Sequence, residues 1–384
     1  MEPLLRGRFA PSPSGRMHLG NVFTALLAWL SVRSAGGTLV LRMEDLDPDR
    51  CREEYAQVLA EDLRWLGLDW DEGWQKGGPH GPYLQSERTE RYAAAFRALE
   101  EQGLLYPCYC TRAERLAASA PHRSDGQVVY SGKCRHLTEE ERARLAQTRC
   151  PAWRLIVPDQ EISFTDGLQG LYRENLLRDC GDFILRRSDG VYAYQLAVVC
   201  DDGDMGVTQV VRGRDLLDST PRQLWLYERL GLTPPAFFHV PLLCAPDGRR
   251  LSKRERDLDM GALRQRYTPE QLVGLLAFWA GQMDRPEPAA AAELAPCFDW
   301  GKVPREDIAV GELPSVEKAA KPLFRERPHG GRGSFSCEKV TPSTMRSVIS
   351  DAHVAGNDGF SFDSCGCGRR NSARLFFGEG FSTA

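Results

Sequence analysis

The segment from Arg8 to Asn21 constrains the fold most, because it passes from strand to turn to helix over a short stretch. Residues 5–10 are interpreted as a short strand. Two prolines and a glycine between residues 11 and 15 exclude regular structure and predict a stiff turn. From His18 onward, apolar residues return at three- and four-residue spacing, which predicts a helix. The segment therefore predicts a strand, a polar loop and a helix N-terminus.

This arrangement predicts an anion site. A helix N-terminus carries unsatisfied N–H groups and a partial positive charge, so it suits a phosphate group. His18 and the hydroxyl groups of Ser12 and Ser14 would face an anion bound there. The segment lacks the glycine spacing of a P-loop or a dinucleotide fingerprint. Taken alone, it is also compatible with an ordinary strand–turn–helix unit that has only a structural role.

Composition limits the class of protein. The 384 residues are 42% hydrophobic, enough for one large or two modest domains. The formal net charge is −4, so a nucleic acid would have to bind through a local basic patch. The 12 cysteines are irregularly spaced, which predicts buried thiols in a reducing cytoplasm. Residues 21–32 are apolar but too few to span a membrane, and we expect a buried helix there.

The rest of the chain alternates between helical and strand patterns. Residues 38–43 predict a buried parallel strand, and the acidic cluster 44–50 follows it. Carboxylates just after such a strand lie where α/β sheets bind ligands, although a solvated turn has a similar composition. Further strands are expected at 152–157, 161–165, 182–187, 207–212 and 237–243, and helices at 53–66, 85–103, 267–281 and 287–294, with a loop at 69–82. These patterns predict an α/β fold.

Three cysteines have a spacing that suggests zinc. Cys108 and Cys110 form a Cys-x-Cys pair, and Cys134 follows about two dozen residues later. A fourth ligand would be needed, and Tyr130, His136 and His122 are all candidates. Unrelated buried cysteines are the alternative.

Two basic positions suit anionic ligands. Arg212 ends a predicted strand, where a guanidinium can hold a carboxylate through two hydrogen bonds, although a surface arginine there would also be ordinary. Ser252 and Lys253 lie in the basic loop 249–254, which can hold the outer phosphates of ATP. A solvated basic turn is the alternative for that loop.

Together these motifs resemble the class I aminoacyl-tRNA synthetases. His18-Leu-Gly-Asn21 is similar to their His-Ile-Gly-His element, with asparagine at the second histidine position. Residues 8–15 and the motif Arg42-Met-Glu-Asp-Leu-Asp47 resemble the glutamyl branch. Residues 250–254 resemble the Lys-Met-Ser-Lys-Ser loop, with arginine in place of the first lysine and of the final serine. The order of the motifs between about residues 6 and 310 is that of the glutamyl-tRNA synthetase catalytic part.

The resemblance implies a set of site residues. His18 and Lys253 would be catalytic, with Gly20 and Asn21 also at the ATP site. Glutamate would be bound by Arg8, Phe9, Ala10, Pro11, Ser12, Glu44, Tyr194 and Arg212. Glu44 would meet the substrate ammonium and Arg212 a carboxylate. Zinc would be held by Cys108, Cys110, Tyr130 and Cys134. Mg²⁺ would accompany ATP.

The resemblance also implies a domain order. We expect a Rossmann-type parallel sheet in two halves, residues 1–105 and 191–256, separated by an inserted zinc-stabilised subdomain at 106–190 that would meet a tRNA end. A helical stem-like region is expected at 257–311 and a largely disordered tail at 312–384, which cannot replace an anticodon-binding domain.

A catalytic core without that domain, joined to the Cys-x-Cys and Tyr-x3-Cys insertion, resembles the glutamyl-Q tRNA(Asp) synthetases. This implies activation of glutamate as an adenylate and its transfer to queuosine at the wobble position of tRNA(Asp), by a monomer. A shortened glutamyl-tRNA synthetase that charges tRNA(Glu) is the alternative enzyme. A non-catalytic tRNA-binding relative is the alternative from another class.

Overall fold

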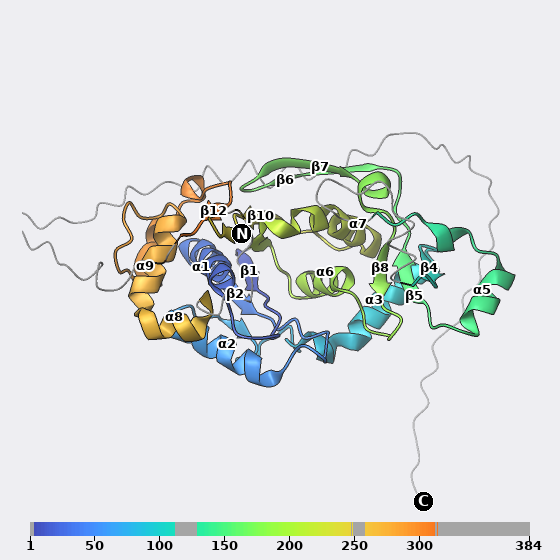
Figure 1. Cartoon of the computed structure of the whole chain (residues 1–384), viewed down its shortest axis with the longest axis horizontal. Helices are drawn as coiled ribbons and strands as arrows, with labels where there is room; N and C mark the ends of the chain where they lie inside the picture. Colours follow the sequence, from blue (N-terminus) through green and yellow to red (C-terminus); the bar gives the residue numbers. More distant parts are fainter. Residues whose placement is uncertain (1–3, 112–128, 247, 249–257, 312, 314–384) are drawn as a thin grey trace, which may run out of the picture. The chain divides into compact units, whose positions relative to one another are not determined.

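A parallel five-stranded sheet forms the centre of the fold in the computed structural model, which describes residues 4–111, 129–246, 248, 258–311 and 313. Its order is β10-β9-β1-β2-β3, and Figure 1 labels β10, β1 and β2 of this sheet. The strands are β1 (Arg6–Phe9), β2 (Thr38–Leu41), β3 (Glu72–Gly73), β9 (Gln209–Gly213) and β10 (Ala236–Val240). All neighbouring pairs are parallel. The predicted α/β class and the strands at β1, β2, β9 and β10 are confirmed.

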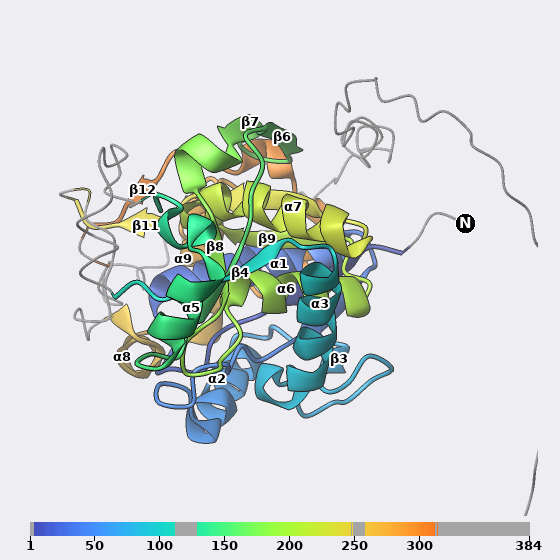
Figure 2. The ribbon, with the colours of Figure 1, turned by 90° about the vertical axis from the view of Figure 1, so that its right-hand side faces the viewer.

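Helices cover both faces of this sheet because its strands are apolar on both sides. Leu39 and Leu41 belong to one hydrophobic cluster, and Val40 between them belongs to the other. The first cluster includes α1 (Leu19–Ser34), α2 (Glu53–Trp65), α8 (Met260–Arg266) and α9 (Pro269–Trp279). The second includes α3 (Thr89–Glu101), α6 (Tyr194–Asp204) and α7 (Thr220–Leu230), which contact one another (Figures 1 and 2).

A separate group of strands lies between β3 and β9 in the sequence. Strands β4 (Leu105–Cys108), β5 (Ala152–Leu155) and β8 (Phe183–Arg186) form an antiparallel sheet. The hairpin of β6 (Glu161–Asp166) and β7 (Gly170–Asn175) leads into a π-helix, η3 (Leu176–Cys180). The short helices η2 (Lys133–His136) and α5 (Glu139–Ala146) precede β5. The expected strands at 152–157, 161–165 and 182–187 are thus present.

The β6–β7 turn docks on the main sheet. The N–H of Gly167 donates to the carbonyl oxygen of Phe237 in β10 at 2.8 Å. A Cβ atom at Gly167 would lie 2.2 Å from the Phe238 ring, so only glycine permits this approach. In Figure 1 the hairpin runs alongside α7, with which β6 is in contact.

Some boundaries differ from those expected. The helix expected at 287–294 is only α10 (Ala291–Leu294), because Pro288 disfavours helical backbone before it. The expected loop 69–82 contributes the short strand β3. The helix expected at 85–103 begins as the 3-10 turn η1 (Gln85–Arg88).

The C-terminal part of the described chain adds smaller elements. The short strands β11 (Leu243–Cys244) and β12 (Ile308–Ala309) pair in parallel, and 3-10 turns η6 (Ala295–Cys297) and η7 (Trp300–Lys302) precede β12. Residues 249–257, which include Lys253, and the expected tail, apart from Leu313, lie outside the described residues. Within the described residues, no helix has both the length and the apolar character needed to cross a membrane.

Candidate active site

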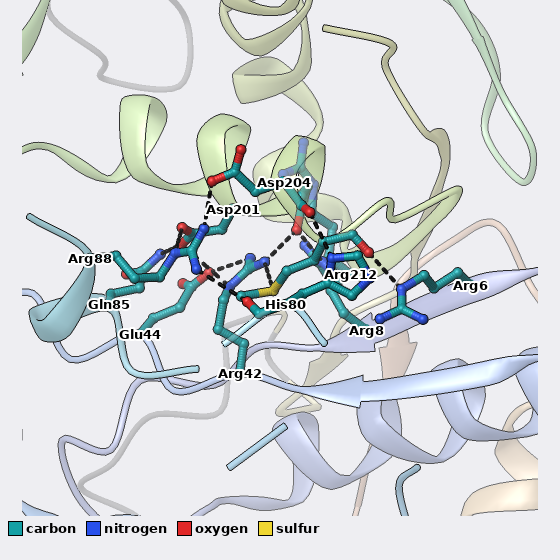
Figure 3. A network of polar contacts seen from close by, with 12 residues as sticks. Arg6, Arg8, Arg42, Glu44, His80, Gln85, Arg88, Asp201, Asp204 and Arg212 are labelled. Carbon is teal, nitrogen blue, oxygen red and sulfur yellow. Dashed lines mark hydrogen bonds and ion pairs between the residues drawn. The ribbon is translucent and has the colours of Figure 1, made fainter. Parts of the chain in front are cut away.

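The predicted glutamate residues meet at the carboxyl ends of the central strands. Arg8 lies on β1, Arg212 on β9, and Glu44 follows β2. Tyr194 begins α6, and its hydroxyl oxygen accepts a hydrogen bond from Arg212 Nη1 at 3.4 Å. Figure 3 shows Arg8, Glu44 and Arg212 in one network of polar contacts. Residues far apart in the sequence are therefore brought together as expected.

The loop after β1 runs beside the loop after β2. The N–H of Arg42 donates to Phe9 O at 3.1 Å, and the N–H of Glu44 donates to Pro11 O at 3.0 Å. Phe9 is 9% exposed, whereas Ser12 is exposed. Ala10 and Pro11 are half-buried between them. This pairing holds the predicted substrate loop, residues 9–12, against the acidic motif.

One buried carboxylate, Asp202 on α6, compensates two arginines. Arg42 Nη1 donates to Asp202 at 2.7 Å, and Arg8 Nε lies 3.5 Å from the same oxygen. Arg42 also approaches Glu44 at 3.3 Å. Burial opposes the charge on Arg42, but Asp202, Asp201 and Glu44 outweigh it and raise the pKa of the guanidinium. Burial raises the pKa of Glu44, against the effect of these arginines.

A second carboxylate on the same helix extends the network. Asp201 accepts hydrogen bonds from Arg88 at 2.6 Å, Gln85 at 2.7 Å and Tyr92 at 3.0 Å. Arg88 also pairs with Asp204 at 2.7 Å (Figure 3). These contacts tie η1 and α3 to α6, so they fix the helix that carries Asp202 and Tyr194.

Arg212 differs from these arginines in its partners. Its Nε donates to His239 Nε2 at 2.9 Å, and its Nη2 donates to Thr220 Oγ1 at 2.8 Å. Its guanidinium also lies 5.1 Å from the ring centre of Phe237. Arg212 is only 4% exposed, and within the described part of the chain it forms no ion pair with an acidic side chain. A buried guanidinium without an acidic partner would be stabilised by an anion bound from outside the protein.

His239 is in turn held by Asp166, the last residue of β6. Its Nδ1 lies 2.5 Å from Asp166 Oδ2, and both side chains are buried. Burial lowers the pKa of His239, against the effect of Asp166. Burial opposes ionisation of Asp166, but hydrogen bonds from His239 and two further N–H groups lower the pKa of this carboxyl overall.

His18 is the N-cap of α1. Its Nδ1 accepts a hydrogen bond from Gly20 N at 3.1 Å, and its own N–H donates to Asn21 Oδ1 at 3.2 Å. A neutral ring with Nδ1 as acceptor carries its proton on Nε2. Asn21 thus completes a capping box at the position where related proteins carry the second histidine of this motif.

The predicted metal ligands form a compact cluster, which we call the thiol cluster: Cys108, Cys110, Tyr130 and Cys134. The three sulfur atoms lie within 4.8 Å of one another, and Cys110 Sγ is 3.4 Å from Cys134 Sγ. The Tyr130 oxygen lies 3.4 Å from Cys108 Sγ and 3.6 Å from Cys110 Sγ. His136 is exposed and not in this group, and His122 lies outside the described residues.

Sequence reasoning missed several residues of the site. Arg42 lies within a motif quoted above, but no role was assigned to it, and Asp201 and Asp202 were not singled out. Adjacent acids at the end of the apolar run 196–200 were a usable signal, since buried acids require cationic partners. His239 and Asp166 gave no local signal.

Comparison with known proteins agrees with this fold. Residues 4–280 match the family described as tRNA synthetases class I (E and Q), catalytic domain. The chain is a member of this family. A solved structure, that of a glutamate tRNA ligase from Elizabethkingia meningosepticum in complex with its amino acid, superposes with a TM-score of 0.69 at 30% identity. The superposition covers 82% of this chain and 68% of that chain.

Curated relatives define the branch. The glutamyl-Q tRNA(Asp) synthetase of Symbiobacterium thermophilum is 54% identical over 312 residues, which is 80% of this chain and 96% of that protein. Glutamate–tRNA ligase 2 of Acidithiobacillus ferrooxidans is 47% identical over 68% of this chain and 55% of that protein. The chain therefore belongs to the glutamyl-Q tRNA(Asp) synthetase branch of its family.

Proposed function

We propose that the protein activates glutamate with ATP and transfers it to queuosine in tRNA(Asp). The relationship just described supports the branch and therefore the acceptor. The structural observation that carries the amino-acid substrate is Arg212, a buried guanidinium whose described partners are all neutral. A carboxylate bound there would supply the missing negative charge.

Three site residues divide the work of binding glutamate. Arg212 binds the side-chain carboxylate, because a carboxylate held tightly by a buried cation is a poorer nucleophile and the α-carboxylate must react. Tyr194 accepts from Arg212, so its own O–H remains a donor for the substrate. Burial raises the pKa of Tyr194, which keeps that proton in place. Glu44 meets the substrate ammonium.

The remaining residues of the predicted pocket shape the site around these contacts. Arg8 adds positive potential beside Arg212, while Phe9, Ala10, Pro11 and Ser12 form the wall next to Glu44. The pairing of this loop with residues 42–44 supports that role.

Activation joins glutamate to AMP. An α-carboxylate oxygen forms a bond to the α-phosphorus of ATP as the bond to the bridging oxygen breaks, and pyrophosphate leaves. Catalysis of this type consists mainly of positioning and charge stabilisation. His18 would donate from Nε2 to an α-phosphate oxygen, with Gly20 and Asn21 at the helix N-terminus. Lys253 would stabilise the pyrophosphate, and Mg²⁺ bound to ATP would neutralise charge.

Transfer completes the reaction. A hydroxyl oxygen of the queuosine cyclopentenediol attacks the activated carbonyl carbon. The bond from that carbon to the phosphate oxygen breaks, and AMP leaves with the electron pair. The hydroxyl proton is released to solvent or to AMP.

The thiol cluster is proposed as a zinc site. Tetrahedral zinc with Zn–S bonds of about 2.3 Å places its sulfur ligands about 3.8 Å apart, close to the separations in the cluster. Cys134 N–H donates to the Tyr130 oxygen at 3.0 Å, which favours a phenolate, and Arg154 lies 3.6 Å above the Tyr130 ring. Burial nevertheless raises the pKa of Tyr130, an effect that a bound cation would oppose. Burial raises the pKa of Cys110 to about 11, and a bound cation would reverse that effect. Zinc would stabilise the inserted subdomain, residues 106–190, where it meets the tRNA.

We place this activity in a reducing cytoplasm. All nine cysteines in the described part of the chain are free thiols, in keeping with that compartment.

The test follows the label from glutamate. The protein is incubated with ATP, Mg²⁺, labelled glutamate and one of three RNAs: tRNA(Asp) with queuosine, tRNA(Asp) without it, and tRNA(Glu). We expect label only on the first, and expect it to survive removal of the 3′-terminal nucleotides. Label on the 3′ end of tRNA(Glu) would instead show a glutamyl-tRNA synthetase activity. Absence of glutamate-dependent ATP–pyrophosphate exchange would refute activation altogether.

A further inference from the structure

A buried chain of three side chains, Asp166–His239–Arg212, joins the β6–β7 hairpin to the proposed glutamate pocket. Asp166 lies 2.5 Å from His239 Nδ1, and Arg212 Nε lies 2.9 Å from His239 Nε2. Their exposed fractions are 2%, 0% and 4%. We propose that Asp166 and His239 are positioning residues that hold the guanidinium of Arg212 in the orientation that binds the substrate carboxylate. This inference rests on the proposed role of Arg212.

The hydrogen bonds of the Asp166–His239–Arg212 chain require one particular tautomer of His239. Arg212 is a permanent donor, so Nε2 must present a lone pair. The ionised carboxylate of Asp166 is an acceptor, so Nδ1 must carry the proton. A proton on Nε2 would place two N–H groups against each other. A doubly protonated ring would set a third cation beside Arg212 and Arg8, which both lower the pKa of His239.

The orientation of Asp166 is fixed by backbone groups. Its Oδ1 accepts from the N–H groups of Leu168 at 3.0 Å, Gln169 at 2.8 Å and His239 at 3.1 Å. Only Oδ2 faces the imidazole. The adjacent turn is docked on β10, so these N–H groups are fixed in place. Rotation of the Asp166 carboxyl group would therefore lose hydrogen bonds.

This geometry defines the guanidinium plane of Arg212. His239 accepts from Nε and Thr220 accepts from Nη2, so the edge of the guanidinium that carries these two nitrogens is held by buried partners, which lie 3.3 Å from each other. Nη1 donates to Tyr194, and one further N–H group remains on each terminal nitrogen. Two fixed donors match the two oxygens of a carboxylate, whereas an amide offers only one acceptor oxygen. Asp166 and His239 therefore contribute to discrimination of glutamate from glutamine without touching either.

Asp166→Asn tests the idea with almost no change in shape. The three N–H groups keep the amide oxygen at the Oδ1 position, so the NH₂ group faces His239 Nδ1. The ring must then accept at Nδ1 and carry its proton on Nε2, against Arg212. Nitrogen-15 NMR of histidine-labelled protein reports which ring nitrogen is protonated. The chain has only seven histidines, and His239→Gln identifies the relevant signals.

We expect wild-type His239 to be protonated on Nδ1 and the Asp166→Asn variant to be protonated on Nε2. We expect the KM for glutamate to rise about ten- to a hundredfold in the variant, while the KM for ATP changes less than about twofold. The preference for glutamate over glutamine should narrow. His239→Gln keeps an acceptor near the Nε2 position, so it should retain more activity than His239→Phe. Glu161→Gln is the matched control, since Glu161 is an exposed acid on the same strand.

The outcomes separate this inference from the proposed function. A wild-type ring protonated on Nε2 would overturn the positioning chain whatever the substrate is. A tautomer change in Asp166→Asn with an unchanged KM for glutamate would overturn the link to substrate binding. If wild-type protein shows no glutamate-dependent exchange, the proposed function fails, and the NMR result still decides the tautomer.

Discussion

Replacing Arg212 by lysine tests the central assignment of the site. The substitution keeps the positive charge but removes the planar fork. In the structure, Arg212 makes three hydrogen bonds, to His239 at 2.9 Å, to Thr220 at 2.8 Å and to Tyr194 at 3.4 Å. A single ammonium group at the end of a flexible chain cannot occupy these positions and also hold both oxygens of a carboxylate.

The magnitude follows from the contacts that are lost. A hydrogen bond to a charged group contributes about 1.5–3 kcal/mol, so loss of one of two carboxylate contacts lowers kcat/KM for glutamate by about ten- to a hundredfold. Thr220 Oγ1 lies 3.3 Å from His239 Nε2 and can donate to that nitrogen in the variant, so the free energy of unfolding should fall by less than the roughly 1–3 kcal/mol of an unpaired buried acceptor. The first quantity is measured by glutamate-dependent ATP–pyrophosphate exchange, and the second by urea unfolding.

Arg214→Lys provides the matched control. Arg214 lies two residues further along, is about one-third exposed, and pairs with Asp307 at 3.4 Å. Exposed pairs of this kind contribute about 0–1 kcal/mol, so Arg214→Lys should change kcat/KM less than about twofold. If Arg212→Lys and Arg214→Lys have the same small effect, Arg212 does not bind the substrate carboxylate and the assignment is wrong.

Four further predictions concern the surrounding structure. Asp202→Asn leaves two buried guanidinium groups undercompensated and should lower the free energy of unfolding by about 3–5 kcal/mol, against less than about 1 kcal/mol for Asp204→Asn on the exposed side of the same helix. Equal losses in urea unfolding would contradict this reasoning. Gly167→Ala places a Cβ atom 2.2 Å from a carbon of the Phe238 ring, so it should raise the KM for glutamate by moving the hairpin that carries the positioning chain; an unchanged KM would argue against that coupling. Because burial lowers the pKa of His239 in the folded state, the unfolded chain binds its proton first, and stability should fall as pH drops from about 6.5 toward the lowered pKa. His239→Gln should lose this part of the pH dependence in unfolding measurements made between neutral and acid pH. Metal analysis should find about one zinc ion per chain, and its removal by a chelator should destabilise the thiol cluster and weaken transfer to tRNA more than ATP–pyrophosphate exchange; equal loss of both activities would count against a role in tRNA contact.

The central sheet was predictable because its signals are local. Residues 38–41 are an apolar run bounded by glycine and by acids, and residues 209–213 end at a glycine break. The helix at 19–34 combines a strong apolar pattern with a capping residue, His18. Strand and helix propensities therefore agreed with the tertiary structure at these positions.

The boundaries that were wrong depend on weaker local preferences. The alanines at 289–292 favour a helix, but the proline at 288 disfavours helical backbone before it, and of the helix expected at 287–294 only residues 291–294 are helical. Strand β3 contains only Glu72 and Gly73, and it forms because Val40 and Leu41 offer an open edge for pairing. Two residues have no periodicity to detect.

The site was predictable only in part, for a related reason. Arg8 and Arg212 carry a signal because each is a charged residue within or at the end of an apolar strand. Asp166 and His239 are 73 residues apart, and their contact depends on a hairpin that docks on β10. No pattern in either segment specifies that docking. Only the assembled structure reveals it.

The arrangement of charge distinguishes supporting arginines from the binding one. Arg8 and Arg42 share Asp202, and Arg88 lies between Asp201 and Asp204. Arg42 and Arg88 are neutralised within the described structure, so they stabilise it and need no ligand, whereas Arg8 shares its single acidic partner with Arg42 and keeps part of its positive potential. Arg212 is equally buried but is held by His239, Thr220 and Tyr194, which fix its direction without neutralising it. Full neutralisation of Arg212 by an acid would remove its affinity for a carboxylate, and full exposure would weaken that affinity in water. Neutral, buried partners avoid both effects, and this is the physical reason to assign substrate binding to Arg212 rather than to the better-paired arginines around it.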